Sequence, residues 1–291
     1  MKKITVFTPS YNRAYLLPQL YSSLINQSNS NFEWLIIDDG STDETKALVI
    51  SWQQENKIEI QYIYQENQGM HAAHNTAYNA ITTEFNVCID SDDYMPPDAI
   101  AIILENCENL DVKFAGIIGL DANNKGEIIG TKIPKSLTAV KLNELYTLHS
   151  VKGDKKIVYR TEIVKKYPKY PLFKNERFVP LDYIYLLVDQ DYDLKPVNEV
   201  LCIVEYQLDG SSMNMLKQYR RHPNGFAFSR LSRIKYGKTF TERFKNAIHL
   251  VSSALFSKNM GWLFNSDKPL LVFMALPFGI LLNLYIRYKT L

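Results

Sequence analysis

The first 108 residues alternate between short apolar segments and segments of helical periodicity, which limits the chain to few folds. Strand-like segments are expected at residues 4–10, 33–41, 58–65 and 85–90. Segments with apolar residues at helical spacing lie between and after them, at 14–28, 42–56, 69–83 and 99–108. Strands that alternate with helices predict an α/β fold with a mostly parallel sheet and right-handed crossovers.

The remainder of the chain divides into two parts. Residues 113–121 predict a strand or two, and residues 150–212 continue the α/β pattern. Beyond residue 212 the sequence changes to basic amphipathic helices. We therefore expect a sheet domain over 1–212, with its ligand-binding half at 1–110 and a second half at 111–212, followed by a helical region at 213–291.

Polar residues gather where the predicted strands end, at 8–11, 38–40, 65–67 and 90–93. In parallel α/β sheets, ligands bind beyond the carboxyl ends of the strands. The four clusters should therefore meet at one edge of the sheet and form a binding site.

The cluster after the fourth strand contains three carboxylates, Asp90, Asp92 and Asp93, separated only by Ser91. Carboxylates this close repel one another and raise one another's pKa, so a cation is expected to compensate them. Mg²⁺ and Mn²⁺ take one or two carboxylates together with substrate phosphates, which predicts a metal site that holds a diphosphate. The alternative is a solvated turn or helix cap, since Asp and Ser are common turn residues.

Charge is distributed unevenly along the chain. Residues 1–212 hold 20 basic and 29 acidic residues, whereas residues 213–291 hold 13 basic and 2 acidic residues. An acidic body with a basic tail suggests that the tail faces an anionic partner. The three cysteines are widely spaced and form no CxxC pair, so we expect neither a zinc site nor a disulfide framework, and the amino terminus lacks the pattern of a signal peptide. A cytoplasmic protein is the expectation.

Four motifs together resemble the nucleotide-sugar-binding half of family 2 glycosyltransferases with the GT-A fold. They are TVFTPSYNR (5–13), FEWLIIDDGSTDET (32–45), ENQGMHAAHNTAYNAI (66–81) and CIDSDDYMPPD (88–98). The resemblance is strong to about residue 110 and weaker to about 212, where GDKKIVYRTEI and EYQLDGSS are similar to a capsular or surface-polysaccharide subgroup. It implies an inverting, metal-dependent transfer from a UDP-sugar to a glycan or polyprenyl-linked acceptor.

The resemblance assigns the nucleotide to the first two motifs. Thr8 and Pro9 would bring the backbone close to the base and ribose, and Tyr11 would stack on the base. As an alternative, Tyr11 covers the sheet edge. Asp39 would accept the imide N–H of uracil, while Asp38 would organise the turn.

The later motifs supply the remaining donor contacts. Asp90 would contact the ribose or the donor sugar, and Asp92 and Asp93 would hold Mn²⁺ or Mg²⁺ on the diphosphate. The resemblance also places six further residues in the nucleotide-sugar-binding set, namely Arg13, Asn67, Gly69, His71, Asn75 and Ser91. His71 and His74 share one helical face, where we interpret them as hydrogen-bonding groups rather than zinc ligands.

The chain departs from this family pattern at two positions. Met70 stands where relatives of the subgroup carry Lys, which removes one phosphate contact. Leu181 stands where the acid that serves as general base is expected, so Asp182 is the first candidate base and Glu176 the second. As an alternative, Asp182 caps the helix that follows it.

The start of the basic region is a candidate for diphosphate binding. Arg220, Arg221 and His222 could reach the diphosphate if this segment folds over it. The alternative is that they form a solvated helix face.

Residues 269–286 form an uncharged run of 18 residues, interrupted by Pro277 and Gly279. This run is at the short end for a membrane span, and the preceding basic helices resemble interfacial anchors. We therefore expect peripheral or re-entrant attachment to the anionic cytoplasmic face of the cell membrane. The alternatives are a spanning helix, a buried helical hairpin, or a dimer interface that would make the protein a homodimer.

Two other functions compete with glycosyl transfer. The departures at Met70 and Leu181 are compatible with a pseudoenzyme that binds a nucleotide sugar without turnover. The basic stretch 219–240 interleaves aromatic residues with cations, as nucleic-acid-binding segments do. The acidic body would repel a phosphate backbone, so no nucleic-acid partner is expected.

Overall fold

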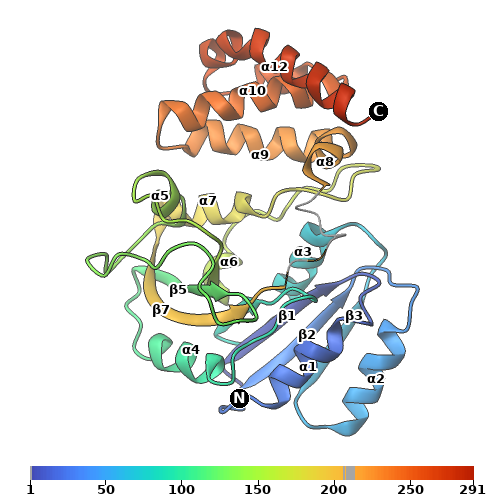
Figure 1. The fold of residues 1–291 in the computed structure, drawn as a ribbon, viewed down its shortest axis with the longest axis vertical. Coiled ribbons are helices and arrows are strands. Elements are labelled where there is room, and N and C mark those ends of the chain that lie inside the picture. The colour runs from blue at the N-terminus through green and yellow to red at the C-terminus, as the bar shows by residue number, and fades with distance from the viewer. Residues whose placement is uncertain (1, 206, 208–213) are drawn as a thin grey trace. The chain divides into compact units, whose positions relative to one another are not determined.

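A computed structural model of the chain describes residues 2–205, 207 and 214–291, and it contains one seven-stranded sheet flanked by helices (Figure 1). The strands lie in the order β3-β2-β1-β4-β6-β5-β7. Strand β6 runs antiparallel to its neighbours β4 and β5, and the other neighbouring pairs are parallel. The strands are β1 (Ile4–Ser10), β2 (Phe32–Asp38), β3 (Ile60–Tyr64), β4 (Phe85–Cys88), β5 (Phe114–Ala122), β6 (Lys155–Arg160) and β7 (Asp193–Ile203).

The predicted α/β alternation is confirmed, with boundaries that differ by a few residues. The helices are α1 (Leu17–Ile25), α2 (Thr45–Glu55), α3 (Met70–Ala80), α4 (Ala99–Cys107), α5 (Leu142–Thr147), α6 (Thr161–Val164), α7 (Asp182–Asp191), α8 (Met215–Arg221), α9 (Pro223–Tyr236), α10 (Phe240–Ser257), α11 (Gly261–Phe264) and α12 (Pro269–Lys289). The helix expected at 14–28 begins only at Leu17, since Pro18 lacks a backbone N–H and suits the first helical turn.

Strands β1 and β2 are buried along their whole length, and both are interior strands of the sheet. Alternate side chains of β1 contact helices on opposite faces. Val6 belongs to the main core cluster with Leu20 of α1 and Ile100 of α4. Phe7 points the other way, where its ring packs edge-on against His74 and at a steep tilt against Tyr78 of α3.

Three stacked aromatic rings fix the first two crossover helices to the sheet. Tyr21 of α1 stacks on Trp52 of α2 with ring centroids 4.3 Å apart, and both rings lie against Trp34 of β2. The Trp34 indole donates a hydrogen bond to Thr8 Oγ1 at 3.0 Å. Stacked aromatic rings bury a large apolar area, and here they hold α1 and α2 against β2.

Backbone hydrogen bonds continue past the strand ends and bring the polar loops together. Asp39 N donates to Ser10 O at 2.8 Å, and Gln65 N donates to Asp38 O at 2.9 Å. On the other side of β1, Ile89 N donates to Phe7 O at 3.0 Å. The loops after β1, β2, β3 and β4 therefore lie at one edge of the sheet.

The chain forms two compact units. The first contains residues 1–168 and 188–207 with the whole sheet, and the second contains residues 169–187 and 208–291. The second unit thus takes in residues 169–187, which sequence alone grouped with the sheet. Helix α7 continues from the second unit into the first.

The second unit is helical, as expected for the basic region. Helix α10 packs against α9 and α12 around a small apolar core. The core residues are Ala227, Ile234, Ala247, Leu250, Val251, Val272 and Ala275. Helix α12 is long and apolar enough to cross a membrane by length and composition, and 28% of its most apolar window is buried in the protein.

Candidate active site

The acidic loop after β4 folds as a tight turn at the carboxyl edge of the sheet. Asp93 N donates to Asp90 O at 3.0 Å, which closes the turn. Asp90 and Asp92 are half-buried, whereas Ser91 and Asp93 are buried. The Asp93 carboxylate accepts the backbone N–H of Glu205 at 3.2 Å and lies 3.7 Å from the Cys202 sulfur. The Asp93 carboxylate is therefore held by Glu205 and Cys202, and Asp92 is the more accessible of the two predicted metal ligands.

A lysine that sequence reasoning missed faces these acids. Lys156 belongs to β6, which lies between β4 and β5 in the sheet, and β7 follows β5. Lys156 is paired with Gly119 of β5. Burial alone would lower the pKa of the Lys156 ammonium, but Cys202, Asp121, Asp93 and Asp90 together raise it well above its ordinary value. Lys156 therefore remains charged and compensates part of the acidic cluster.

Burial has the opposite consequence for the acids beside Lys156. Desolvation raises the pKa of Asp93 to about 7, Lys156 opposes this rise, and Asp90 and Asp92 add to it. Asp121, the β5 partner of Cys202, is 2% exposed, and burial raises its pKa as well. The cluster contains more carboxylates than cations, so it can accept further positive charge.

Hard oxygen donors are the ligands that Mg²⁺ and Mn²⁺ prefer, so Asp92 and Asp93 fit such an ion chemically. Within residues 2–205, 207 and 214–291, no three His, Cys, Asp or Glu side chains converge on a metal position. An ion held at Asp92 and Asp93 would therefore need oxygen ligands from elsewhere, such as a diphosphate.

The Asp39 carboxylate organises the loop between β3 and α3. It accepts hydrogen bonds from Gln65 Nε2 at 2.7 Å, Gln68 N at 3.0 Å and Gly69 N at 2.7 Å. Asp39 itself is buried. Its neighbour Asp38 accepts from Ser41 N at 2.7 Å and from the Tyr62 hydroxyl, which is the geometry of a turn-organising residue.

A close backbone approach joins the loops that follow β2 and β3. Gly40 has a φ of +86°, and a Cβ placed there would lie 2.8 Å from Asn67 N. Glycine is therefore required here both for its backbone conformation and for space. Asn67 and Gly69, two residues of the predicted set, are held beside Asp39 by this contact and by the Gly69 hydrogen bond.

The loop after β1 is tied to the loop after β2 by Asn12, a second residue that sequence reasoning missed. Asn12 adopts a φ of +53°, donates its N–H to Ser41 Oγ at 2.9 Å, and accepts from Thr42 N at 2.8 Å. Tyr11, immediately before it, is 45% exposed. Its ring is thus accessible at the edge of the sheet, as stacking on a base requires.

The other predicted residues of the first motif have local partners. The Thr8 hydroxyl accepts from Trp34, and Thr8 is fully buried within β1, where it is paired with Ile36 of β2. Pro9 lies in β1 opposite Ile37. Arg13 Nη1 donates to the Tyr15 hydroxyl at 2.7 Å.

The helix after β3 buries both of its predicted histidines. Desolvation, helped by His71, lowers the pKa of His74 to about 3. His74 Nε2 is 3.7 Å from the Cys88 sulfur, and Nδ1 is 3.4 Å from the Tyr78 hydroxyl. His74 is therefore a neutral core residue; His71 is also buried, Asn75 is half-buried, and Met70 is exposed.

Both candidate bases make contacts within the second unit. Glu176 accepts hydrogen bonds from Asn224 N at 3.0 Å and Gly225 N at 2.9 Å, so it caps the amino terminus of α9. Asp182 accepts from Ser229 Oγ at 3.2 Å and forms an ion pair with Arg233. Asp182 stands at the first position of α7, and these two partners lie on α9 rather than in its own first turn.

The basic residues expected at the diphosphate also contact the second unit. Arg220 Nη1 donates to Thr290 O at 2.9 Å, at the carboxyl end of α12. His222 Nδ1 accepts the backbone N–H of Arg177 at 3.1 Å. Arg221 is exposed.

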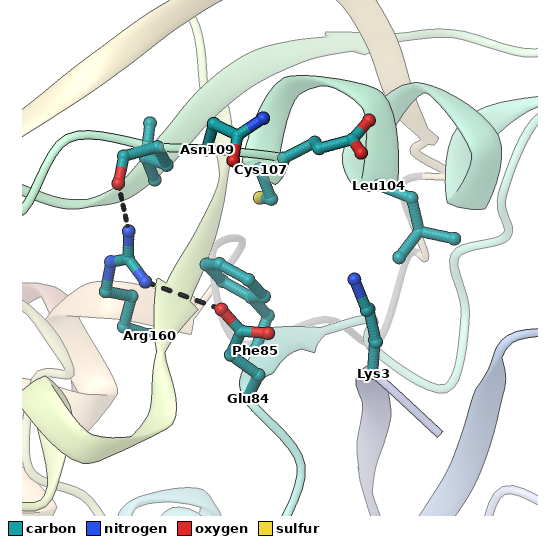
Figure 2. Close-up of a pocket in the computed structure, with 9 residues that line it drawn as sticks. Lys3, Glu84, Phe85, Leu104, Cys107, Asn109 and Arg160 are labelled. Carbon is teal, nitrogen blue, oxygen red and sulfur yellow. Dashed lines mark hydrogen bonds and ion pairs between the residues drawn. The ribbon is translucent and has the colours of Figure 1, made fainter. Parts of the chain in front are cut away.

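A cavity of about 370 Å³ lies at the opposite edge of the sheet, at the amino ends of β1 and β4 (Figure 2). Lys3, Phe85 and Arg160 contribute to its lining. The Arg160 guanidinium donates to Leu110 O at 2.5 Å and lies 3.5 Å from a Glu84 oxygen. The Arg160 guanidinium thus joins β6 to the segment that follows α4. We therefore place the candidate active site at the carboxyl edge of the sheet, where the polar loops meet.

Solved structures of glycosyltransferases have the same arrangement of sheet and helices, which shows that this protein has a GT-A fold. Residues 1–349 of TarS from Staphylococcus aureus, in complex with UDP-GlcNAc, match with a TM-score of 0.59 at 19% identity, over 96% of this chain and 80% of that one. The mannosyltransferase PcManGT from Pyrobaculum calidifontis, in complex with GDP-Man and Mn²⁺, matches with a TM-score of 0.59 at 18% identity, over 97% and 87% of the two chains.

The sequence pattern of glycosyl transferase family 2 matches residues 5–167, and the chain belongs to this family. An uncharacterized glycosyltransferase of Nostoc sp. is 30% identical over 174 residues, which is 56% of this chain and 52% of the relative. Chondroitin synthase of Escherichia coli is 31% identical over 102 residues, which is 35% of this chain and 15% of that protein. The chain thus spans about half the length of the Nostoc relative and a smaller part of the synthase.

Proposed function

We propose that this glycosyltransferase moves a sugar, with inversion, from a UDP-sugar to a glycan or polyprenyl-linked oligosaccharide during the synthesis of a surface or capsular polysaccharide. The observation that carries the proposal is the acidic turn at Asp90–Asp93, placed at the sheet edge where the loops after β1, β2 and β3 also end. The names of the relatives support the substrate class, because TarS is a poly(ribitol-phosphate) β-N-acetylglucosaminyltransferase and was solved with UDP-GlcNAc.

Asp92 and Asp93 would hold a divalent ion together with the donor diphosphate. Their carboxylate oxygens suit Mg²⁺ or Mn²⁺, and the surplus of acids over cations around Lys156 favours an added positive charge. When bound, such an ion stabilises the negative charge that develops on the departing diphosphate. Asp93, fixed by Glu205, would orient the turn, and Asp92 would be the more exposed ligand.

The uridine would lie over the loops after β1 and β2. The exposed ring of Tyr11 offers a stacking surface for the base. An ionised carboxylate has about four acceptor positions, and Asp39 uses three of them on the β3–α3 loop, so one remains for the imide N–H of uracil. Asp90 would contact the ribose or donor sugar, with Arg13, Asn67, His71, Asn75 and Ser91 around the nucleotide.

Asp182 is the better of the two candidate bases for the acceptor hydroxyl. Glu176 is engaged through both carboxylate oxygens as the cap of α9. Asp182 is held by Arg233 and Ser229, and these two contacts fix the direction of its carboxylate. General-base assistance of this kind contributes about 10²–10⁴-fold to a transfer rate.

The second unit would place the enzyme at the cytoplasmic face of the membrane, where a polyprenyl-linked acceptor is found. Arg221, and Arg220 if it leaves Thr290, would add positive charge near the donor diphosphate, and His222 would contribute its other ring nitrogen as a hydrogen-bonding group. The basic composition of residues 213–291 supports attachment to an anionic surface.

Ligand-dependent thermal unfolding tests the proposed site without an acceptor. UDP with Mn²⁺ should stabilise the full-length chain, since a ligand that binds only the native state at about 100 times its Kd adds about 2.7 kcal/mol. Asp92→Ala should lose the Mn²⁺-dependent part of the shift and the transferase activity. Asp98→Ala is the matched control, because Asp98 is exposed and its side chain makes no cap hydrogen bond to α4.

Two outcomes would reject the proposed site. One is an Asp92→Ala variant that retains the full Mn²⁺-dependent shift; the other is stabilisation by UDP that does not respond to Mn²⁺ or to a chelator. Comparison of UDP-Glc, UDP-Gal, UDP-GlcNAc, UDP-GalNAc and UDP-glucuronic acid in the same assay identifies the donor by the largest shift.

A further inference from the structure

Helix α12 presents an apolar face that no described part of its own unit covers. Its members lie on one side of the helix, at steps typical of a single helical face, and each is between 50% and 73% exposed. We define this outer face by Leu270, Phe273, Met274, Leu281, Leu284 and Tyr288. A contiguous exposed apolar surface of this length on one helix is a feature of interaction sites.

The opposite side of α12 is fixed to α10. Gly279 approaches so closely that a Cβ there would lie 2.4 Å from the Val251 Cβ. Asn283 Nδ2 donates to Ser252 O at 3.1 Å in a buried position, and Arg287 Nε donates to Asn283 Oδ1 at 2.8 Å. The helix therefore cannot turn its outer face inward without losing these contacts.

The packing against α10 also argues against a helix that spans a bilayer. Helix α10 contains Glu242, Arg243 and Lys245 in its first turns, and it would have to enter the bilayer together with α12. Charged side chains are costly in the hydrocarbon core. A helix that keeps one side on α10 can still bury its other side in the interfacial layer, with its axis parallel to the membrane.

The charges around the outer face indicate which surface it meets. Lys268 and Lys289 are exposed at the two ends of α12, within a region that holds 13 basic and 2 acidic residues. Anionic phospholipid attracts such a region, whereas a second copy of it would be repelled. The aromatic Tyr288 has the amphipathic ring that is enriched at membrane interfaces.

We propose that the outer face of α12 is a monotopic membrane-binding surface that lies flat on a bilayer containing anionic phospholipid. This inference gives the proposed peripheral location a specific surface. It does not depend on the transfer reaction, because lipid binding can be measured without donor or acceptor.

Vesicle sedimentation of the full-length chain tests the surface. The wild type should bind phosphatidylcholine–phosphatidylglycerol vesicles, and the triple variant Phe273→Ser/Leu281→Ser/Leu284→Ser should bind them at least about tenfold more weakly. The matched control is Val112→Ser/Leu148→Ser/Leu172→Ser, which removes three exposed apolar side chains elsewhere. A cooperative urea-unfolding transition with the wild-type midpoint in vesicle-free buffer would show that each variant is folded.

The charge component has its own pair of variants. Lys268→Gln/Lys289→Gln should reduce binding to vesicles that contain phosphatidylglycerol and reduce its dependence on salt, because fewer cations face the lipid. Lys125→Gln/Lys135→Gln removes two exposed lysines of the first unit and should leave binding unchanged.

Three results would overturn the proposal. The first is equal vesicle binding by the wild type and the Phe273→Ser/Leu281→Ser/Leu284→Ser variant. The second is a wild type that is dimeric in light scattering and does not bind vesicles, together with a variant that is monomeric. The third is a membrane-bound fraction that resists alkaline carbonate extraction, which would indicate a spanning helix. If donor binding fails while vesicle binding behaves as expected, the proposed function is rejected and the lipid surface stands.

Discussion

The Asp39 carboxylate accepts the backbone N–H of Gly69 at 2.7 Å, and this hydrogen bond joins the end of β2 to the first turn of α3. The two residues are 30 positions apart, and both are buried. Loop geometry at the candidate nucleotide site therefore depends on a side chain that is also the proposed reader of the base.

Replacing Asp39 by Ala should have two separable effects. Three donors of the β3–α3 loop lose their acceptor, which should lower the free energy of unfolding by about 1–3 kcal/mol in the absence of ligand. UDP affinity should fall far more than the affinity for Mn²⁺. Calorimetric titration and urea unfolding measure the two effects, and unchanged UDP affinity would remove Asp39 from the site.

Replacing Gly40 by Ala should disturb the same loops by steric contact. The new Cβ would lie 2.8 Å from Asn67 N, whereas a Cβ added to Gly126, which has a similar positive φ of +78°, would meet no atom within 4 Å. Both variants carry the cost of a positive φ, about 1–2 kcal/mol. Gly40→Ala should cost more than Gly126→Ala in urea unfolding and should alone weaken UDP binding; equal costs would contradict the close approach.

Asp182→Asn should lower the transfer rate by about 10²–10⁴-fold and leave the Kd for the UDP-sugar unchanged, because the carboxylate is proposed to act only on the acceptor hydroxyl. Steady-state kinetics and donor titration measure the two quantities. The comparison variant is Glu176→Gln, which weakens the cap of α9 and should lower stability more than rate. If Asp182→Asn turns over at the wild-type rate, the base lies elsewhere.

Acid should destabilise the fold through His74. Burial lowers its pKa from 6.5 to about 3, so between these values the unfolded chain binds a proton that the folded chain excludes. The free energy of unfolding should therefore decrease as the pH falls from 6.5 toward 3, by about 3 kcal/mol at pH 4. Part of the slope comes from His249, whose pKa burial also lowers to about 3.

Urea unfolding across this pH range, with His74→Gln as the variant, isolates the contribution of His74. The variant should reduce the slope, and His149→Gln, at an exposed position, should not. A slope that is the same in wild type and His74→Gln would show that the buried histidine is protonated in the folded state.

Sequence alone predicted the sheet edge correctly, because the change from apolar to polar residues marks where each of the first four strands ends. Residues 4–10 form β1 as expected, and the polar residues after β2, β3 and β4 follow directly from the apolar runs. Local periodicity is sufficient for this, since strand, crossover helix and strand are consecutive in a parallel unit.

The contribution of the later strands could not be predicted in the same way. Strand β6 is inserted between β4 and β5 in the reverse direction, and this order brings Lys156 beside Asp93 and Asp121. Nothing in the sequence around residues 155–160 indicates which strands will be its neighbours. Residues 169–187 were likewise grouped with the sheet, because the α9 residues that contact Glu176 and Asp182 lie 47 or more positions further along the chain.

Lys156 has a consequence for how the protein exists between reaction cycles. Because the Lys156 ammonium compensates part of the acidic cluster from within the sheet, the fold should persist when a chelator removes divalent ions. Each arriving donor then meets a surface that is already formed, and little of its binding energy is needed to assemble one.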